Sequence, residues 1–111
     1  MGTINKDLKV RLSVLTEAEG GAAAAINHGC RPFFRYHGKK WIVVVNFFGR
    51  RMAYPGETVN AYVTFLTPIK QLGRISEGLE FELCMGPKVM AKGVVTKVID
   101  LWRSASDAKE H

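Results

Sequence analysis

The chain has 111 residues, of which 47% are hydrophobic and 23% charged, values typical of a folded globular domain and not of a disordered chain. Its 16 Lys and Arg against 10 Asp and Glu give a formal net charge of +6, which favours encounters with polyanions or acidic partners. No apolar run approaches the length of a membrane helix, and the N-terminus lacks the apolar run of a signal peptide, so we expect a cytoplasmic protein with no membrane contact. The length predicts a single domain over residues 1–111.

The positive charge is concentrated in the middle of the chain. No Asp or Glu occurs between Glu19 and Glu57. This interval holds six cationic residues, Arg31, Arg35, Lys39, Lys40, Arg50 and Arg51. We therefore expect a local positive field there, which added salt would screen.

The first strand is predicted over residues 8–15, where Leu8, Val10, Leu12 and Val14 alternate with polar residues. A period of two is typical of a half-buried strand. Residues 16–30 contain several glycines around a run of four alanines, which is too short to form a lasting helix alone. We expect this segment to be a long surface loop.

A hairpin is predicted next. Residues 31–37 and 41–48 are rich in aromatic and β-branched side chains, and residues 37–40 read as the turn between them. Residues 49–56 then form a loop, in which Pro55 and Gly56 suit the central positions of a type II turn.

Two further strands are predicted over residues 58–66 and 79–85, separated by a loop over 67–78. In the second of these strands Leu79, Phe81, Leu83 and Met85 alternate with two glutamates. The alternation predicts that Glu80 and Glu82 face water, as a solvated strand face and not as an acid/base pair.

The last strand is predicted over residues 88–99, after a hairpin turn at Gly86 and Pro87. Lys92 and Lys97 are five residues apart, so a regular strand would point one of them into the core. We expect a β-bulge at Gly93, which would bring both lysines to solvent and bend the strand, as closure of a small barrel requires.

Six strands without a strong amphipathic helix indicate an all-β sandwich or barrel. The tail, residues 101–111, is expected to be a helical turn or frayed.

The order of these signals resembles the C-terminal β-barrel domain of bacterial elongation factor Tu over about residues 7–100. The resemblance rests on Glu-Gly-Gly at 19–21, Gly-x-Arg-Pro-x-Phe at 29–34, Pro-Gly-Glu at 55–57, Gly-Leu-x-Phe at 78–81 and Gly-Val-Val-x-Lys-Val at 93–98. It implies a six-stranded antiparallel closed β-barrel. The chain contains no phosphate-binding loop, so GTP binding and hydrolysis are not expected.

The resemblance also implies a role related to translation, because the family's barrel helps to hold aminoacyl-tRNA and packs against protein partners. This chain departs from the family at the tRNA side: Phe33 replaces a glutamine, and residues 84–87 read Cys-Met-Gly-Pro where the family has Arg-Glu-Gly-Gly. Losing two polar contacts at about 1 kcal/mol each would weaken binding about tenfold to a hundredfold. We expect that the chain does not carry aminoacyl-tRNA as the full factor does.

The candidate binding residues are those of the basic hairpin and of the strands beside it: Arg31, Arg35, Lys39, Lys40, Gly86, Lys88 and Lys92. Two functions remain open. The first is a non-catalytic protein-interaction module, and the second is an RNA-binding module using residues 31–41, in which cations hold phosphates and rings stack on bases. Alternation puts Phe33 and Arg35 on one face and Phe34 and Tyr36 on the other, so one aromatic set belongs to the core.

Catalysis, cofactors and metal binding are not predicted. His28 and Cys30 are spaced as two metal ligands, but no second ligand pair stands at zinc spacing. Nothing orients Cys30 or Cys84 toward a histidine as a nucleophile needs. Two cysteines in a chain without an export signal are expected to be free thiols.

Overall fold

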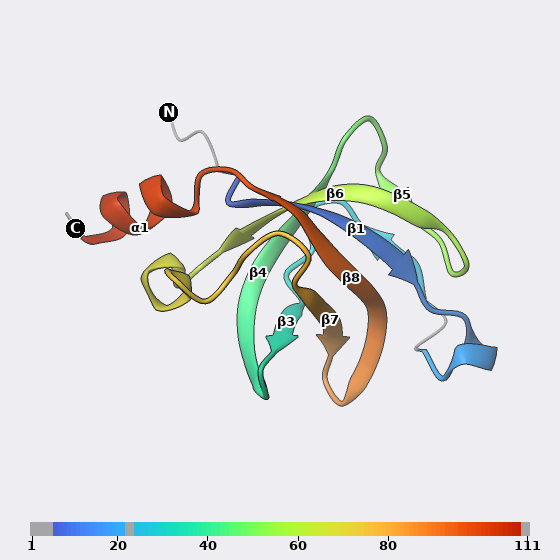
Figure 1. Cartoon of the computed structure of the whole chain (residues 1–111). Helices are drawn as coiled ribbons and strands as arrows, with labels where there is room; N and C mark the ends of the chain where they lie inside the picture. Colours follow the sequence, from blue (N-terminus) through green and yellow to red (C-terminus); the bar gives the residue numbers. More distant parts are fainter. Residues whose placement is uncertain (1–5, 22–23, 110–111) are drawn as a thin grey trace.

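The structure, a computed structural model, describes residues 6–21 and 24–109. It confirms the predicted six-stranded antiparallel closed barrel, in which the strands follow the order β1-β6-β4-β3-β7-β8 and β8 pairs with β1 to close the sheet (Figure 1). The strands are β1 (Leu8–Val14), β3 (Phe33–Tyr36), β4 (Lys39–Phe47), β6 (Thr58–Phe65), β7 (Glu80–Met85) and β8 (Lys88–Val98).

The barrel interior is filled by the apolar members of each alternating strand. In β1 the four predicted apolar residues are buried, whereas Arg11 and Ser13 between them are exposed. Phe34 lies at the centre of the core, and its ring stacks on Phe81 with centroids 4.1 Å apart and meets Phe65 edge-on at 5.0 Å. Burial of large rings such as these removes apolar surface from water, which is the main stabilising term in folding.

The β3–β4 turn is shorter than predicted. Tyr36 pairs with Lys39, so only His37 and Gly38 form the loop, and Lys40 lies within β4. His37 has φ 49° and Gly38 has φ 77°. Positive φ at both positions is what a two-residue type I′ turn requires, because its twist matches that of the paired strands.

The bulge predicted at Gly93 is wrong. Gly93 pairs in register with Leu12 on one side and Phe81 on the other. The irregularities lie elsewhere in β8: Thr96 is the extra residue opposite β1, and Met90 is the extra residue opposite β7. Gly93 instead makes room for the Phe81 ring, because a Cβ there would lie 2.4 Å from Phe81 Cζ.

The bulge at Thr96 produces the outcome predicted for the two lysines. Lys92 and Lys97 are both exposed, since the extra residue between them shifts the alternation by one. The Thr96 hydroxyl donates to the Lys9 carbonyl at 3.0 Å, which supplies a partner to a backbone oxygen beside the irregularity.

β7 departs from its predicted alternation at its end. Phe81 and Leu83 are buried as predicted, but Met85 is 51% exposed and Cys84 is buried. The register of the β7–β8 pair shifts between Leu83 and Cys84, so the simple alternation stops there. Glu80 is exposed as predicted, whereas the prediction for Glu82 is only partly confirmed because its side chain is half-buried.

The predicted loops contain short elements of their own. β2 (Ile26–Asn27) pairs with β5 (Met52–Ala53) as a separate two-stranded sheet, and η1 (Glu17–Glu19) follows β1. Residues 22 and 23 of the alanine run lie outside the described residues. The turn predicted at Pro55 and Gly56 is present, with Gly56 at φ 90° and the Glu57 N–H donating to the Tyr54 carbonyl at 3.0 Å.

A 3-10 helix and the tail pack together beside the barrel. η2 (Pro68–Gln71) lies next to α1 (Leu101–Lys109), so the tail is a nine-residue helix and not a single turn (Figure 1). Gln71 is fully buried, and its Oε1 accepts a hydrogen bond from the Tyr36 hydroxyl. No helix in the described part of the chain is long and apolar enough to cross a membrane.

Candidate functional site

The sheet register aligns four charged residues across four neighbouring strands. Lys40 of β4 pairs with Arg35 of β3, Arg35 pairs with Glu82 of β7, and Glu82 pairs with Lys92 of β8. The neighbours of Arg35 and Glu82 along their strands are core residues, so this row lies on the outer surface of the barrel. Three cations and one carboxylate therefore stand side by side.

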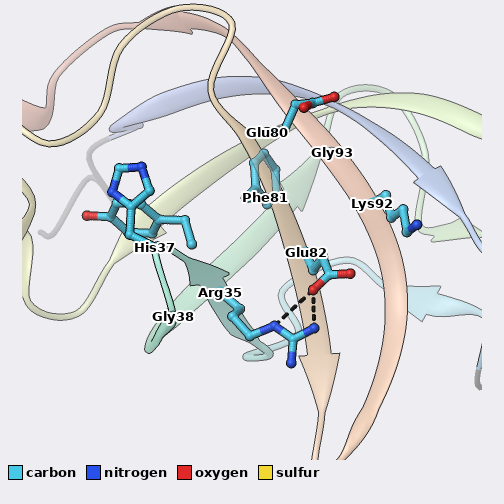
Figure 2. A pocket seen from close by; sticks show the side chains of 9 residues that line it. Arg35, His37, Gly38, Glu80, Phe81, Glu82, Lys92 and Gly93 are labelled. Carbon is cyan, nitrogen blue, oxygen red and sulfur yellow. Dashed lines mark hydrogen bonds and ion pairs between the residues drawn. The ribbon is translucent and has the colours of Figure 1, made fainter.

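Arg35 and Glu82 form an ion pair at the centre of this row (Figure 2). Arg35 Nε donates to Glu82 Oε1 at 2.9 Å, and Arg35 Nη2 donates to the same oxygen. This hydrogen bonding raises the pKa of Arg35 above its ordinary value. The charges of Arg35 and Glu82 largely cancel, so the positive ends of the row are Lys40 and Lys92.

A line of exposed apolar residues on neighbouring strands lies beside the charged row. Ile42 pairs with Phe33, and Phe33 pairs with Cys84. Ile42 is 43% exposed and Phe33 is 36% exposed, and the half-exposed Met85 follows Cys84. Apolar side chains held on a rigid sheet and surrounded by charges are typical of the centre of a protein interface.

Lys40 connects the two hairpins that flank this surface. Its Nζ lies 5.9 Å from the centroid of the Phe33 ring and 3.4 Å from the carbonyl oxygen of Gly86. Gly86 has φ 59° and begins the two-residue loop between Met85 and Lys88. The β3–β7 pairing places the β3–β4 hairpin beside the β7–β8 turn, and Lys40 adds a side-chain contact between them.

An open hollow of about 600 Å³ adjoins the row, and Figure 2 shows it from close by. Its charged lining consists of Arg35, Glu80, Glu82 and Lys92, with His37 and Gly38 from the β3–β4 turn. Its carboxylates lie among cations and face solvent, which suits polar contacts with a partner. Among the described residues, no group of three or more His, Cys, Asp or Glu side chains is placed to hold a metal ion.

The structure brings together four of the seven candidate residues. Arg35, Lys40 and Lys92 share the row, and Gly86 is contacted by Lys40. Lys88 is exposed at the adjoining β7–β8 turn.

The remaining two candidates stand apart from the row. Lys39 pairs with Tyr36, whose side chain is buried, so Lys39 belongs to the opposite side of the strand from Lys40. Arg31 is exposed in the segment that precedes β3.

Most aromatic rings of the 31–41 hairpin are not available on the surface. Phe34 and Tyr36 are buried in the core, and Trp41 packs partly buried against it. Phe33 and the exposed His37 are the rings of this hairpin that solvent reaches most.

Sequence reasoning missed two members of the surface. Ile42 lies within a continuous apolar run, which conceals the outward position that its pairing with Phe33 reveals. Glu82 was expected only to face water, but it holds Arg35 across strands that are 47 residues apart. The opposite charges of Arg35 and Glu82 are the signal that the sequence offers for Glu82, whereas the apolar run offers none for Ile42.

The His28 and Cys30 pair has a structural explanation. His28 Nδ1 accepts a hydrogen bond from the Phe47 backbone N–H at 2.9 Å, and this nitrogen therefore satisfies the backbone. Cys30 and Cys84 are both free thiols. Burial raises the pKa of Cys30 to about 11, so its thiol is protonated at neutral pH. No family model matches the sequence.

Proposed function

We propose that this chain is a non-catalytic protein-interaction module, and that its partner docks on the outer surface of β4, β3, β7 and β8. We call this surface the β3–β7 face and define it by Phe33, Arg35, Lys40, Ile42, Glu82 and Lys92. The proposal rests mainly on Ile42 and Phe33, two exposed apolar side chains that are paired across β4 and β3 beside the charged row.

The charges of this face favour a partner of particular chemistry. Lys40 and Lys92 flank the Arg35–Glu82 ion pair, and Lys88 stands at the adjoining turn. A complementary surface would present an apolar patch to Phe33 and carboxylates to the lysines around it. The apolar contact would supply most of the affinity, whereas the charges would set orientation and association rate.

Protein binding is better supported at this face than RNA binding. A surface that stacks bases needs several exposed rings, but Phe34 and Tyr36 are buried. Glu80 also lines the adjoining hollow, where its exposed carboxylate would repel phosphates. The RNA-binding alternative at residues 31–41 therefore has fewer supporting features than the sequence indicated.

A non-catalytic role is supported by the state of the candidate nucleophile and base. The raised pKa of Cys30 keeps its thiol protonated, and His28 already accepts a backbone hydrogen bond. Two free thiols fit the reducing conditions of the cytoplasm, where we place the protein.

A connection to translation follows from the resemblance to the C-terminal barrel of elongation factor Tu. The closed six-stranded barrel is the fold which that resemblance implies, and this supports the proposal. A separate barrel of this kind would mimic the full factor and compete for one of its protein partners.

The test is affinity capture from lysate with the purified chain, with and without nuclease. The matched variants are Phe33→Ser and Ile42→Ser on the face, and Trp102→Ser as a control, since Trp102 is exposed on α1. We expect a nuclease-resistant partner that both face variants bind at least about 30-fold more weakly, while Trp102→Ser binds it normally.

Two results would overturn the proposal. The first is retention that nuclease abolishes. The second is a partner whose affinity for Phe33→Ser and Ile42→Ser equals its affinity for the unmodified chain. Excess full-length elongation factor Tu should displace the partner, and failure to do so would refute the mimicry while leaving the interaction face intact.

A further inference from the structure

A second surface of the barrel has a different charge pattern from the β3–β7 face. β1 lies between β6 and β8 (Figure 1), and the register places Lys9 between Tyr62 of β6 and Lys97 of β8. Arg11 lies opposite Asn60. The outward positions of β1 and β6 alternate with core residues and contain no Asp or Glu.

Two aromatic rings join the cations on this surface. Lys6 Nζ lies 4.4 Å from the centroid of the Tyr62 ring. Phe48, which directly follows β4, is 77% exposed. The surface, which we call the β1–β6 face, comprises Lys6, Lys9, Arg11, Phe48, Asn60, Tyr62 and Lys97.

The rings and the amide surround a hollow. Lys9, Phe48, Asn60, Ala61 and Tyr62 line a depression of about 230 Å³. It is bounded by a cation, an amide and two rings, and no carboxylate is among the residues that line it. Exposing a phenylalanine as fully as Phe48 is costly in water, and a flat apolar group stacked on its ring would recover that cost.

A second hollow continues the surface beyond Phe48. It measures about 500 Å³ and is lined by Phe48, Arg51 and the exposed Tyr54 among others. Two residues that line this hollow, Arg50 and Tyr54, contact the carboxylate of Glu57, whose Oε1 accepts from Arg50 Nη2 at 2.7 Å and from the Tyr54 backbone N–H at 2.8 Å. That acid is already compensated, so it opposes a negative ligand only weakly.

We propose that the β1–β6 face binds single-stranded nucleic acid. Lys6, Lys9, Arg11 and Lys97 would hold phosphates, while Phe48 and Tyr62 would stack on bases. Side-chain amides such as that of Asn60 hydrogen-bond to base edges. Rings that stack need unpaired bases, so the surface fits a single strand better than a duplex. This inference goes beyond the protein-interaction role and concerns a separate face.

The first test is an anisotropy titration with a fluorescein-labelled oligo(dT) of about 12 nucleotides, which is within the length that one small barrel covers. If the four cations each release counterions, the logarithmic salt slope is about −2.8, and affinity falls about 50-fold between about 50 and about 200 mM salt. The affinity of the Lys9→Gln/Arg11→Gln variant should fall only about sevenfold over the same salt range. The Lys40→Gln/Lys88→Gln variant, matched in charge on the other face, should keep the full slope.

The second test removes the ring and keeps the fold. Phe48→Leu should weaken oligo(dT) binding between about fivefold and about 150-fold with an unchanged salt slope, because stacking is lost while the cations remain. A thermal melt checks folding, which a side chain this exposed should not affect.

Three results would overturn the inference. One is duplex of the same length binding as tightly as the single strand, and another is full affinity in Phe48→Leu. The third is a chain that does not bind oligo(dT) but sediments with phosphatidylserine vesicles, while the Lys9→Gln/Arg11→Gln variant does not sediment. That result would assign the face to an anionic lipid surface.

Discussion

Packing inside the barrel is most open to a direct test at Gly93. An ideal Cβ at this position lies 2.4 Å from Cζ and 2.8 Å from Cε2 of Phe81, and 2.9 Å from Cδ2 of Leu12. The Phe81 ring has little room to retreat, because it stacks on Phe34 with centroids 4.1 Å apart and 16° between the ring planes. Gly93→Ala therefore forces the ring or the strand to move.

The expected cost follows from two opposing effects. Overpacking a close-packed core costs about 1–3 kcal/mol, whereas replacing glycine by alanine gains about 0.4–1 kcal/mol by restricting the unfolded chain. Gly93 is not among the glycines with positive φ, so backbone strain does not contribute. We expect a net loss of about 1–2 kcal/mol, which for a domain of this size lowers Tm by about 4–8 °C.

Urea and thermal unfolding followed by circular dichroism would measure this cost. The control is the same substitution in a Phe81→Leu background, where the two ring atoms that lie closest to the new Cβ are absent. There Gly93→Ala should cost about 1 kcal/mol less than in the unmodified chain. A higher Tm for Gly93→Ala alone, or an equal cost in both backgrounds, would refute the packing argument.

Three further predictions concern individual groups. Tyr36→Phe leaves the buried Gln71 Oε1 without its hydroxyl donor and should cost about 1–3 kcal/mol in urea unfolding; an unchanged midpoint would mean that this hydrogen bond contributes nothing. Because burial raises the pKa of Cys30 from 9.0 to about 11, its thiolate fraction at pH 8 is about a hundredfold below that of an unshifted thiol. Labelling of Cys30 by iodoacetamide, mapped by mass spectrometry, should be slower by about the same factor. A labelling rate equal to that of a free thiol would contradict the shift. Hydrogen bonding from Arg50 lowers the pKa of Glu57 below its unfolded value, so the carboxylate stabilises the fold above about pH 4.3, and this stabilisation is lost as pH falls through the folded pKa. The difference in the free energy of unfolding between the unmodified chain and Glu57→Gln should therefore shrink as pH falls over that range. A constant difference would contradict the shift.

The strands were predictable because the barrel separates a dry interior from a wet exterior. Alternation over residues 8–14 and 58–65 therefore appears directly in the sequence. The β2–β5 pair was not predictable, since two residues on each side carry no periodic pattern and their pairing depends on the tertiary fold. The spacing of the lysines in β8 revealed that a bulge exists, but not that Thr96 forms it.

Gly93 was misassigned because its function is set by a residue from another strand. Glycine in a strand indicates either a bulge or a close approach, and sequence alone does not distinguish the two. The neighbour that decides the matter is the Phe81 ring on β7. The same reason explains the missed role of Glu82, whose partner Arg35 lies on a strand 47 residues earlier.

The distribution of charge over the surface is determined by strand pairing and not by position in the chain. The acid-free interval between Glu19 and Glu57 predicted a positive field in the middle of the sequence. In the fold two of its cations are compensated by acids from outside it, since Arg35 pairs with Glu82 and Arg50 pairs with Glu57.

The four cations of the β1–β6 face, in contrast, all come from outside the interval: Lys6, Lys9, Arg11 and Lys97. The two faces should therefore respond differently to salt, because an apolar contact is screened little and phosphate contacts are screened strongly. Raising salt from about 50 to about 200 mM should leave binding at the β3–β7 face within a few-fold while it releases single-stranded nucleic acid from the β1–β6 face. If binding at the two faces depended equally on salt, charge contacts would dominate at the β3–β7 face as well. The neutralisation of Arg35 by Glu82 would then have no effect on what that face binds.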